Sequence, residues 1–336
     1  MTAVDLVVVG DANPDVLVDG APADVRYGQR EQLVGDGRLV LGGSAAITAC
    51  GAARLGLRTA LVSVVGDDAA GTFVLAELAA AGVDTTAVRV LPGATPLSVV
   101  LRAGADRAIL TYRGVLDELS AADVPARLLA DCRAVHAASY FLQPRLAGGL
   151  PALFAAARAA GATTSLDTND DPRDTWSGLP DVLAHTDVLL PNERELLRIT
   201  AASVSTAGTT PPPGRAGPAD ASTVESAAAA LAATGVLPVV TLGAAGALTV
   251  AGQTILRAAA PPVATVDSVG AGDSLTAGFL AGRLGGRPLA DCLRLAVACG
   301  ALSTRAPGGT AGQPTLTEAD TVAGAAAATA GTARIA

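Results

Sequence analysis

The second half of the chain alternates strand-like and helix-like segments, and this rhythm restricts the fold more than any other feature. Strands are expected at 134–139, 163–167, 188–191, 238–242 and 247–250, and helices at 150–160, 193–199, 223–234 and 274–284. Near the N-terminus, strands at 6–10 and 59–65 flank a small-residue helix at 45–55. Strands that alternate with helices build a mainly parallel sheet covered on both faces. The sequence therefore predicts an α/β fold.

Two segments do not follow this rhythm. The run Arg102-Ala103-Gly104-Ala105-Asp106 lies between two apolar stretches, which is typical of a β-hairpin. The polar, glycine-containing segment 19–40 has no helical or strand period. We predict that the segments at about 19–40 and 93–115 form a small β lid on a single domain, 1–336.

The composition indicates a folded protein without a membrane span. Half of the 336 residues (50%) are hydrophobic and the mean hydropathy is +0.45, so a large core is available. No run of 18 or more apolar residues occurs, and the N-terminal segment has no basic region typical of a secretory signal. We therefore expect a cytoplasmic protein with no membrane partner. Residues 201–222 are rich in Pro, Gly, Ser and Thr and are predicted to be a disordered insertion.

The residue types that are missing exclude several kinds of chemistry. All 23 basic residues are arginines, so Schiff-base enzymes and P-loops that end in Gly-Lys-Ser/Thr are excluded. Two histidines, His136 and His185, are too few for a three-histidine zinc site. The four cysteines form no C-x-x-C pair and suit buried thiols in a reducing compartment. A net charge of −8 and a pI near 4.8 argue against nucleic-acid binding.

The most informative segment for chemistry is Gly270-Ala271-Gly272-Asp273, which opens an apolar helix. Glycines separated by one small residue let successive backbone amides turn toward one point at a helix N-terminus, which favours an anion. Asp273 lies in the same turn, where a carboxylate can serve as a helix cap or as a base close to the anion.

Two further segments suit a nucleotide and a metal ion. Asn192 and Glu195 stand three residues apart at a helix start, where an amide and a carboxylate can hold hydrated Mg²⁺ or simply cap the helix. Thr241, Gly243 and Gly246 follow a strand, and the glycines allow either a close approach by a nucleotide or a plain hairpin.

Polar residues near the N-terminus suit sugar hydroxyls. Asn13 and Asp15 come just after the first buried strand, at the sheet edge where α/β proteins bind ligands. Gly42 and Gly43 precede a helix and can let substrate oxygens approach the backbone. A plain Asx-rich turn followed by a helix start is the alternative interpretation of these two segments.

Together, these motifs and their order resemble the PfkB (ribokinase-like) family of carbohydrate kinases, from about residue 4 to 315. The run Gly42-Gly43-Ser44-Ala45-Ala46-Ile47 is similar to the family's N-terminal signature. The run Asp267-Ser268-Val269-Gly270-Ala271-Gly272-Asp273 resembles its C-terminal signature, with Ser268 where Thr is usual. Asn192-Glu193-Arg194-Glu195 matches the family's N-x-x-E motif.

The resemblance implies a three-layer α/β/α sandwich with a β lid and an ATP-dependent transfer to a hydroxymethyl group. Asp273 would be the general base, and the amides of Gly270, Ala271 and Gly272 would form the anion hole. Asn192 and Glu195 would organise Mg²⁺ and its waters. Asp267 lies where family members often hold a monovalent cation such as K⁺.

The resemblance also implies which residues bind the two substrates. Those at the sugar would be Asn13, Asp15, Gly42, Gly43 and Asn169, the last from a D-x-N-x-R…W-like stretch. Those at the nucleotide would be Asn192, Thr241, Gly243 and Gly246. A small-molecule sugar would be the partner, and an exposed lid sheet can pair two copies into a homodimer.

Several positions depart from the family pattern. Ile47 replaces a usual Asn, which removes one partner for a sugar hydroxyl. Asp171 occupies an expected Arg position, although Arg173 lies two residues on, and this argues against a phosphorylated acceptor. Val297 stands where many members place an Asn near the adenine. Trp176 is expected to be a packing anchor.

The remaining expectations concern three lid arginines and three alternative functions. Arg102, Arg107 and Arg113 can reach substrate from the lid, but we expect them to be solvated lid charges. A nucleoside kinase on the same fold is the closest alternative; Ile47 favours it, and the shortage of aromatic residues (2%) argues against it. A degenerate, sugar-sensing member would not need to keep Asp273. A Rossmann dehydrogenase is disfavoured because no G-x-G-x-x-G follows the first strand.

Overall fold

The strands predicted from the βα rhythm form one large sheet. The structure, a computed structural model, describes residues 4–104, 106–205, 221–326 and 332–334. Within these ranges the sheet has ten strands, in the order β14-β13-β12-β11-β10-β9-β8-β1-β4-β5. From β11 to β5 neighbouring strands are parallel, and β12, β13 and β14 extend the sheet antiparallel. The strands are β1 (Leu6–Val9), β4 (Thr59–Gly66), β5 (Asp84–Leu91), β8 (Ala134–Ala137), β9 (Thr163–Leu166), β10 (Val188–Leu189), β11 (Leu237–Thr241), β12 (Ala247–Ala251), β13 (Thr254–Ala258) and β14 (Thr332–Arg334).

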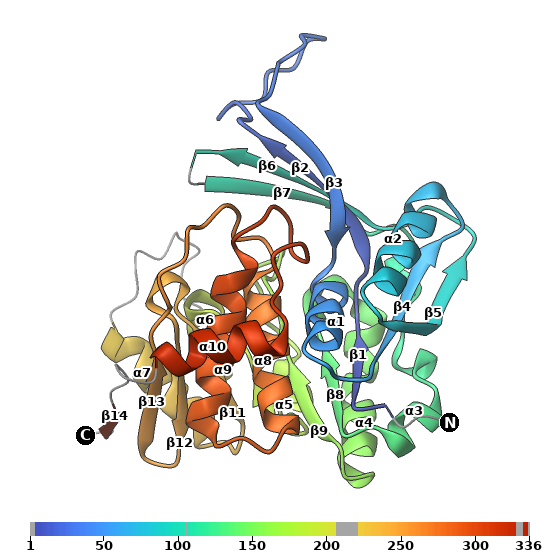
Figure 1. Cartoon of the computed structure of the whole chain (residues 1–336). Coiled ribbons are helices and arrows are strands. Elements are labelled where there is room, and N and C mark those ends of the chain that lie inside the picture. The colour runs from blue at the N-terminus through green and yellow to red at the C-terminus, as the bar shows by residue number, and fades with distance from the viewer. Residues whose placement is uncertain (1–3, 105, 206–220, 327–331, 335–336) are drawn as a thin grey trace.

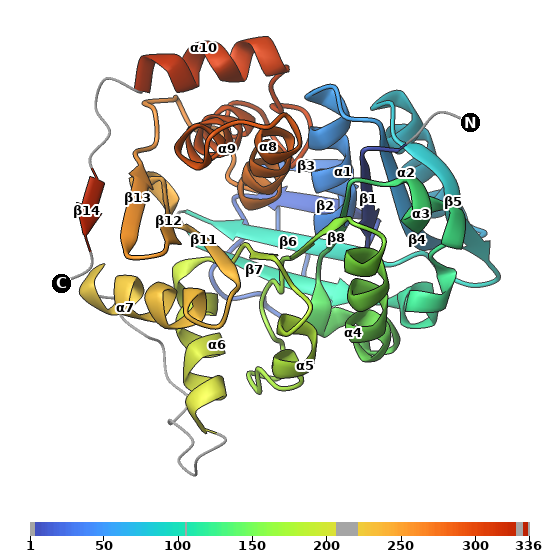
Figure 2. The ribbon, with the colours of Figure 1, turned by 90° about the horizontal axis from the view of Figure 1, so that it is seen from below.

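Helices cover both faces of this sheet and give the three-layer sandwich (Figure 2). One face carries α1 (Ser44–Arg54), α2 (Ala69–Ala80), α8 (Ala271–Leu284), α9 (Leu289–Ser303) and α10 (Leu316–Ala326). The other carries α3 (Ala126–Asp131), α4 (Pro144–Ala159), α5 (Leu179–Leu183), α6 (Glu193–Ser205) and α7 (Ala221–Ala232). Within the described ranges, none of these helices is long and apolar enough to cross a bilayer.

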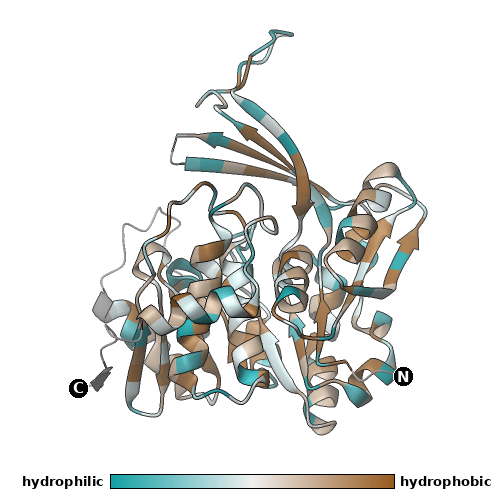
Figure 3. Ribbon diagram, viewed as in Figure 1, coloured by the Kyte–Doolittle hydropathy of each residue, from teal (hydrophilic) through white to brown (hydrophobic). Residues whose placement is uncertain are grey.

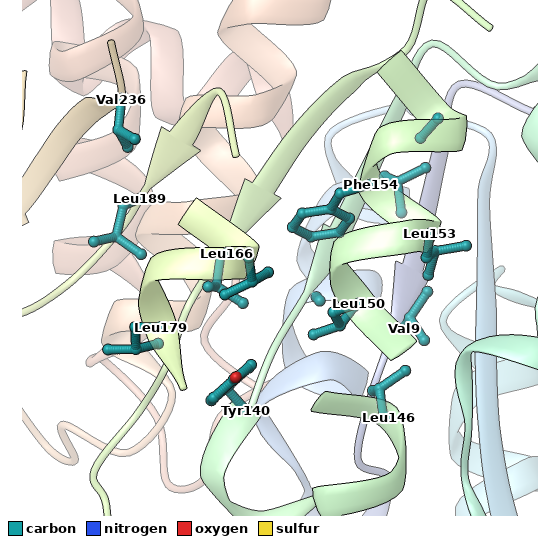
Figure 4. Close-up of a cluster of buried hydrophobic side chains, with 14 of the residues drawn as sticks. Val9, Tyr140, Leu146, Leu150, Leu153, Phe154, Leu166, Leu179, Leu189 and Val236 are labelled. Carbon is teal, nitrogen blue, oxygen red and sulfur yellow. The ribbon is translucent and has the colours of Figure 1, made fainter. Parts of the chain in front are cut away.

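The core lies in two layers because successive residues of each central strand point to opposite faces. In β1, Val7 and Val9 pack toward α4, whereas Leu6 and Val8 pack toward α1 and α8. Figure 4 shows the first layer, in which Phe154 and neighbouring leucines of α4 fill the space beside Val9. With few aromatic residues available, aliphatic side chains fill most of this interior.

A separate four-stranded sheet stands over one edge of the main sheet as a lid (Figure 1). Its order is β3-β2-β6-β7, and its strands are β2 (Asn13–Asp19), β3 (Asp36–Gly42), β6 (Leu97–Ala103) and β7 (Asp106–Tyr112). Since β2 follows β1 after a short turn, the lid is anchored at the carboxyl end of a central strand.

The lid begins earlier in the chain than the sequence indicated. The segment 19–40 was expected to contribute the first part of the lid, but Asn13–Asp19 is itself a strand, and the loop between β2 and β3 projects away from the body (Figure 1). Asn13 and Asp15 therefore lie on a lid strand and not in a turn below it. Most of the predicted insertion at 201–222 lies outside the described residues, although its first residues continue α6.

Candidate active site

Most of the predicted site residues line one cleft between the lid and the carboxyl ends of the parallel strands, whereas Gly42, Gly246 and Asp267 do not line it. The cleft has a volume of about 1030 Å³. The predicted residues that line it are Asn13, Asp15, Gly43, Asn169, Asn192, Glu195, Thr241, Gly243, Gly270, Ala271, Gly272 and Asp273. Open α/β sheets bind ligands at this edge, and a cleft of this size accommodates two small substrates side by side.

The N-terminus of α8 forms the floor of the cleft. Gly270 precedes the helix in the left-handed region (φ 72°), and a Cβ there would lie 2.5 Å from the Cα of Gly309, so only glycine fits. The Ala271 amide donates to the Ser268 carbonyl at 3.3 Å. Within the described residues, the amides of Gly270, Gly272 and Asp273 donate to no protein acceptor, so they can face an anion.

Asp273 lies in the first turn of α8 among other acids. Removal from water raises the pKa of Asp273 well above its usual range, and the negative charge of Asp167 raises it further. The Ser44 hydroxyl donates a hydrogen bond to the Asp273 carboxylate, which opposes this rise. A carboxylate with a raised pKa is a stronger base than a solvated one, which suits proton abstraction from a hydroxyl group.

The lid end of the cleft holds the predicted sugar residues. The Asn13 Nδ2 donates to the Asp15 carboxylate at 2.7 Å, and both residues are buried. Burial and the charge of Asp11 raise the pKa of Asp15 to about 7, whereas Asn13 and Arg107 lower it. A Cβ on Gly42 would lie 2.1 Å from the Asp15 carboxyl carbon, so Gly42 leaves the room that this side chain occupies.

Glycine is also required at position 43, because of the backbone conformation and of a close contact with Asp11. It precedes α1 with φ 88°, and a Cβ would lie 2.7 Å from the Asp11 carbonyl oxygen. The Asp11 carboxylate accepts the amides of Ser44 at 3.2 Å and Ala45 at 3.1 Å, and it therefore caps the start of α1.

The inner face of the lid consists of successive polar, apolar and charged rows of side chains. Strand register places Asp15, Ser98 and Thr111 in one polar row, and Leu17, Val100 and Ile109 in the next, apolar row. The third row joins Asp19, Arg102 and Arg107 at the hairpin tip. A substrate beneath this face therefore meets hydroxyl partners nearest the root of the lid and apolar groups farther out.

The three lid arginines have different surroundings. Arg102 lies 3.1 Å from Asp19 and 3.5 Å from Asp267, so it joins the lid tip to the loop before α8. Arg113 pairs with Asp117 at 2.7 Å, outside the cleft. Arg107 lines the cleft and acts on Asp15; sequence reasoning treated it as a solvated charge.

Asn192 and Glu195 cap α6 and also face the cleft. The Asn192 amide donates to the Glu195 carboxylate at 2.8 Å, and the Glu195 amide donates to the Asn192 side chain at 2.9 Å. Burial raises the pKa of Glu195 to about 7, and the charges of Asp170 and Asp273 add to the rise. Hard oxygen donors amid this negative charge fit a hydrated Mg²⁺. Within the described residues no group of three or more His, Cys, Asp or Glu forms a complete metal cage.

The two glycines that follow β11, Gly243 and Gly246, have different positions relative to the cleft. Thr241 and Gly243 line the cleft beside Asn192, where a nucleotide can approach the backbone. Gly246 does not line it: a Cβ there would lie 2.0 Å from the Ala258 carbonyl oxygen, so this glycine permits the turn into β12 to pack against the end of β13.

The loop after β9 contains one site residue and two structural ones. The Asn169 side chain accepts the Ser139 amide at 2.9 Å and donates to the Ser44 hydroxyl at 3.4 Å. The Asp171 carboxylate accepts backbone amides of its own loop, including that of Trp176 at 2.8 Å. Trp176 is buried edge-on against Phe141 and is a packing anchor, as expected.

Comparison with known proteins places the chain in a family. The model of the pfkB family of carbohydrate kinases matches residues 4–316. Fructoselysine 6-kinase of Escherichia coli is 30% identical over 77% of this chain and 88% of its own length. Fructokinase of Klebsiella pneumoniae is 31% identical over 90% of this chain and 93% of its own.

A solved structure shares the fold over almost the whole chain. It is a putative ribokinase II from E. coli in complex with ATP and Mg²⁺, with a TM-score of 0.78 and 24% identity over 95% of this chain and 98% of its own. This likeness shows the fold, and the family model and the relatives define the class, a kinase that acts on small molecules. The chain belongs to the PfkB family of carbohydrate kinases, and it is an ATP-dependent enzyme of that class.

Proposed function

We propose that this enzyme transfers the γ-phosphoryl group of ATP to a hydroxymethyl group of a sugar or a sugar-like alcohol, giving ADP and a sugar phosphate. One observation carries the proposal: Asp273 and the open amides of α8 lie in the same cleft as the lid pair Asn13 and Asp15 and the strand end at Thr241. The cleft thus joins a base, an anion site and polar groups for an acceptor.

In this mechanism the acceptor lies under the lid, with its hydroxyls bound by Asp15 and Asn13. Asp273 accepts the proton of the attacking hydroxyl. At the same time the hydroxyl oxygen bonds to the γ-phosphorus, and the bond between the γ-phosphorus and the bridging oxygen of the β-phosphate breaks. The amides of Gly270 and Gly272 stabilise the charge on the transferring group. This route needs no lysine at the phosphate, in agreement with the lysine-free sequence.

Asn192 and Glu195 would hold Mg²⁺ through its water molecules, because their side chains are bonded to each other and offer few free lone pairs. The metal ion would neutralise charge on the phosphates of ATP. Thr241 and Gly243 lie along the nucleotide, beside Asn192.

Asp267 does not fit a direct ligand for K⁺. Its carboxylate accepts the amides of Val269 at 3.0 Å and Gly308 at 2.8 Å, and Arg102 lies 3.5 Å away. Both carboxylate oxygens therefore already have partners, so we assign K⁺ no step through this side chain. Replacing K⁺ by choline in the assay is expected to change turnover less than about twofold; a complete dependence on K⁺ would contradict this.

The acceptor is expected to have a less hydroxylated side. Ile47 packs against Gly309 and Gly270, where it closes the wall beside the anion site with methyl groups. Ile47 lines the cleft together with Val100 and Ile109, which lie in the lid row next to that of Asp15, and the three give the cleft an apolar surface. The same surface suits a nucleoside, which keeps a nucleoside kinase as the second candidate.

The discriminating experiment measures ADP release with Mg-ATP across free sugars, sugar acids, polyols and nucleosides, each against a control without acceptor. Acceptor-dependent ADP from a sugar or polyol supports the proposal, and a nucleoside as the best acceptor supports the second candidate. ATP binding without any turnover on this panel would favour a sugar-sensing protein.

The base is tested by Asp273→Asn, which is expected to lower turnover by several orders of magnitude while ATP binding persists. The matched control is Asp170→Asn, because Asp170 lines the same cleft but pairs with Arg194 at its exposed rim. Near-normal turnover in Asp273→Asn would refute the base assignment.

We also propose that two copies pair through the outer faces of their lids. The outer row joins Leu39, Val16, Val99 and Leu110, and Leu39 and Leu110 are 54% and 60% exposed. Figure 3 shows how apolar residues run along these strands. Leu110→Glu is expected to give a monomer in light scattering, and Val90→Glu, on β5 away from the lid, is not; a monomeric parent protein would contradict the proposal.

We place the enzyme in the cytoplasm, where ATP is available. The four cysteines, all buried and free, suit a reducing compartment. A fractionation in which the native protein appears outside the cytoplasm would contradict this.

A further inference from the structure

Ser44, at the first position of α1, makes a contact that the mechanism above does not use. Its Oγ donates to the Oδ1 of Asp273, although the two residues are 229 positions apart in the chain. Ser44 is buried (8% exposed), and its own amide is fixed by the Asp11 carboxylate. The hydroxyl is thus held beside the proposed base by a rigid helix start and not by a mobile loop.

A second contact determines which way the Ser44 hydroxyl points. The Asn169 Nδ2 donates to the Ser44 Oγ at 3.4 Å, while the Asn169 Oδ1 accepts the amide of Ser139 at 2.9 Å. Because Ser139 fixes the orientation of the Asn169 amide, Ser44 must accept from Asn169. The single hydrogen of Ser44 is then left for Asp273.

The Asp273 carboxylate has few other partners and many like charges around it. Asp167 at the end of β9, Asp11 and Asp15 near the start of β2, and Glu195 on α6 all act on it or respond to its charge. Within the described residues, Ser44 is the only residue whose side chain donates a hydrogen bond to the Asp273 carboxylate.

We infer that Ser44 is a positioning residue for the base: its hydrogen bond turns the Asp273 carboxylate toward the acceptor and favours its ionised form. The inference rests on the proposed function, in which Asp273 takes the proton. It adds a role to the N-terminal Gly-Gly-Ser segment, whose third residue reaches past the sugar site to the base.

The test compares acceptor-dependent kcat of the full-length enzyme from about pH 5.5 to 9. A hydrogen bond to a carboxylate commonly lowers its pKa by about one unit, so Ser44→Ala is expected to move the acidic limb of kcat upward by about one pH unit. At pH values well below the limb this gives a loss of roughly tenfold, and the KM for ATP stays unchanged. Ser44→Thr, which keeps the hydroxyl, is expected to restore the limb.

The matched control is Thr48→Ala, one turn along the same buried helix. The Thr48 hydroxyl donates to the backbone carbonyl of Asp273 at 3.4 Å and not to its carboxylate. It is therefore expected to leave the acidic limb in place. Should Ser44→Ala fail to fold, Ser44→Cys replaces it, because the thiol is of similar size and a weak donor.

The outcomes separate this inference from the function it rests on. An acidic limb that stays in place in the folded Ser44 variant, or that moves equally in Thr48→Ala, overturns the positioning role. If Asp273→Asn is inactive in that case, only the inference about Ser44 is lost. If Asp273→Asn retains turnover, the assignment of the base itself is wrong.

Discussion

The Asp15 side chain should destabilise the enzyme in the absence of an acceptor. It is only 7% exposed and lies over Gly42, with Asn13 as its hydrogen-bond donor. Burial and the charge of Asp11 raise its pKa from 3.8 to about 7. Because the carboxylate is disfavoured in the folded state, Asp15→Asn is expected to stabilise the ligand-free protein above that pH.

The size and the pH window of this effect follow from the raised pKa. Below pH 3.8 the carboxyl is protonated in both the folded and the unfolded state, and there is no penalty. The penalty grows as the pH rises toward 7 and is constant beyond it. At about 1.4 kcal/mol per pKa unit, the ionised Asp15 lowers the free energy of unfolding by about 4 kcal/mol. About 2 kcal/mol of this loss develops above pH 5.5.

The assay is chemical unfolding of both proteins without ligands, at pH 5.5 and pH 8.5. The difference in unfolding free energy between Asp15→Asn and the parent is expected to widen by about 2 kcal/mol between these pH values. Comparing this difference in unfolding free energy at the two pH values removes the part of the substitution's effect that does not depend on pH. The variant should also lose acceptor binding. A difference that is independent of pH, or that narrows at pH 8.5, would refute the reasoning.

Three further predictions follow from single contacts. Gly42→Ala would push the Asp15 carboxylate aside, so the acceptor KM should rise at least about tenfold with the KM for ATP unchanged; equal changes in both KM values would contradict this. Arg102→Met removes the ion pair between the lid tip and Asp267, and we expect a two- to fivefold rise in acceptor KM, absent in a matched Arg113→Met. Since the pKa of Glu195 is about 7, Mg²⁺ affinity should weaken below that pH, and Glu195→Gln should abolish this pH dependence in a titration of activity against Mg²⁺.

The sequence predicted the central strands of the main sheet because they are buried and therefore form apolar runs, but it missed β13, β14 and the largely exposed β5. Strand β2 was missed for a definite reason. Its polar residues Asn13 and Asp15 alternate with the apolar residues Pro14 and Val16, so the first part of the strand has one polar and one apolar face. Read one residue at a time, the polar positions resembled a turn; read with a period of two, they indicate a strand.

The site was predicted from short local motifs. That prediction could not include the contacts between segments that are distant in the sequence. The glycines at 42 and 270 and the acid at 273 stand in short motifs that local reasoning can interpret. The roles of Ser44 and Asp167 depend on which charges lie beside them once the sheet has formed. Arg107 could be recognised as facing the cleft only from the register of β6 and β7.

The packing of α1 on α8 has a consequence for the synthesis of the protein. Helix α1 lies against residues 271–284, and Gln313 donates to both the Ile47 carbonyl and the Ser274 hydroxyl. A chain that leaves the ribosome N-terminus first therefore completes the lid strands β2 and β3 and helix α1 long before α8 exists. Until residue 313 has emerged, the small-residue face of α1 is exposed, and the nascent chain can bind neither phosphate nor acceptor productively.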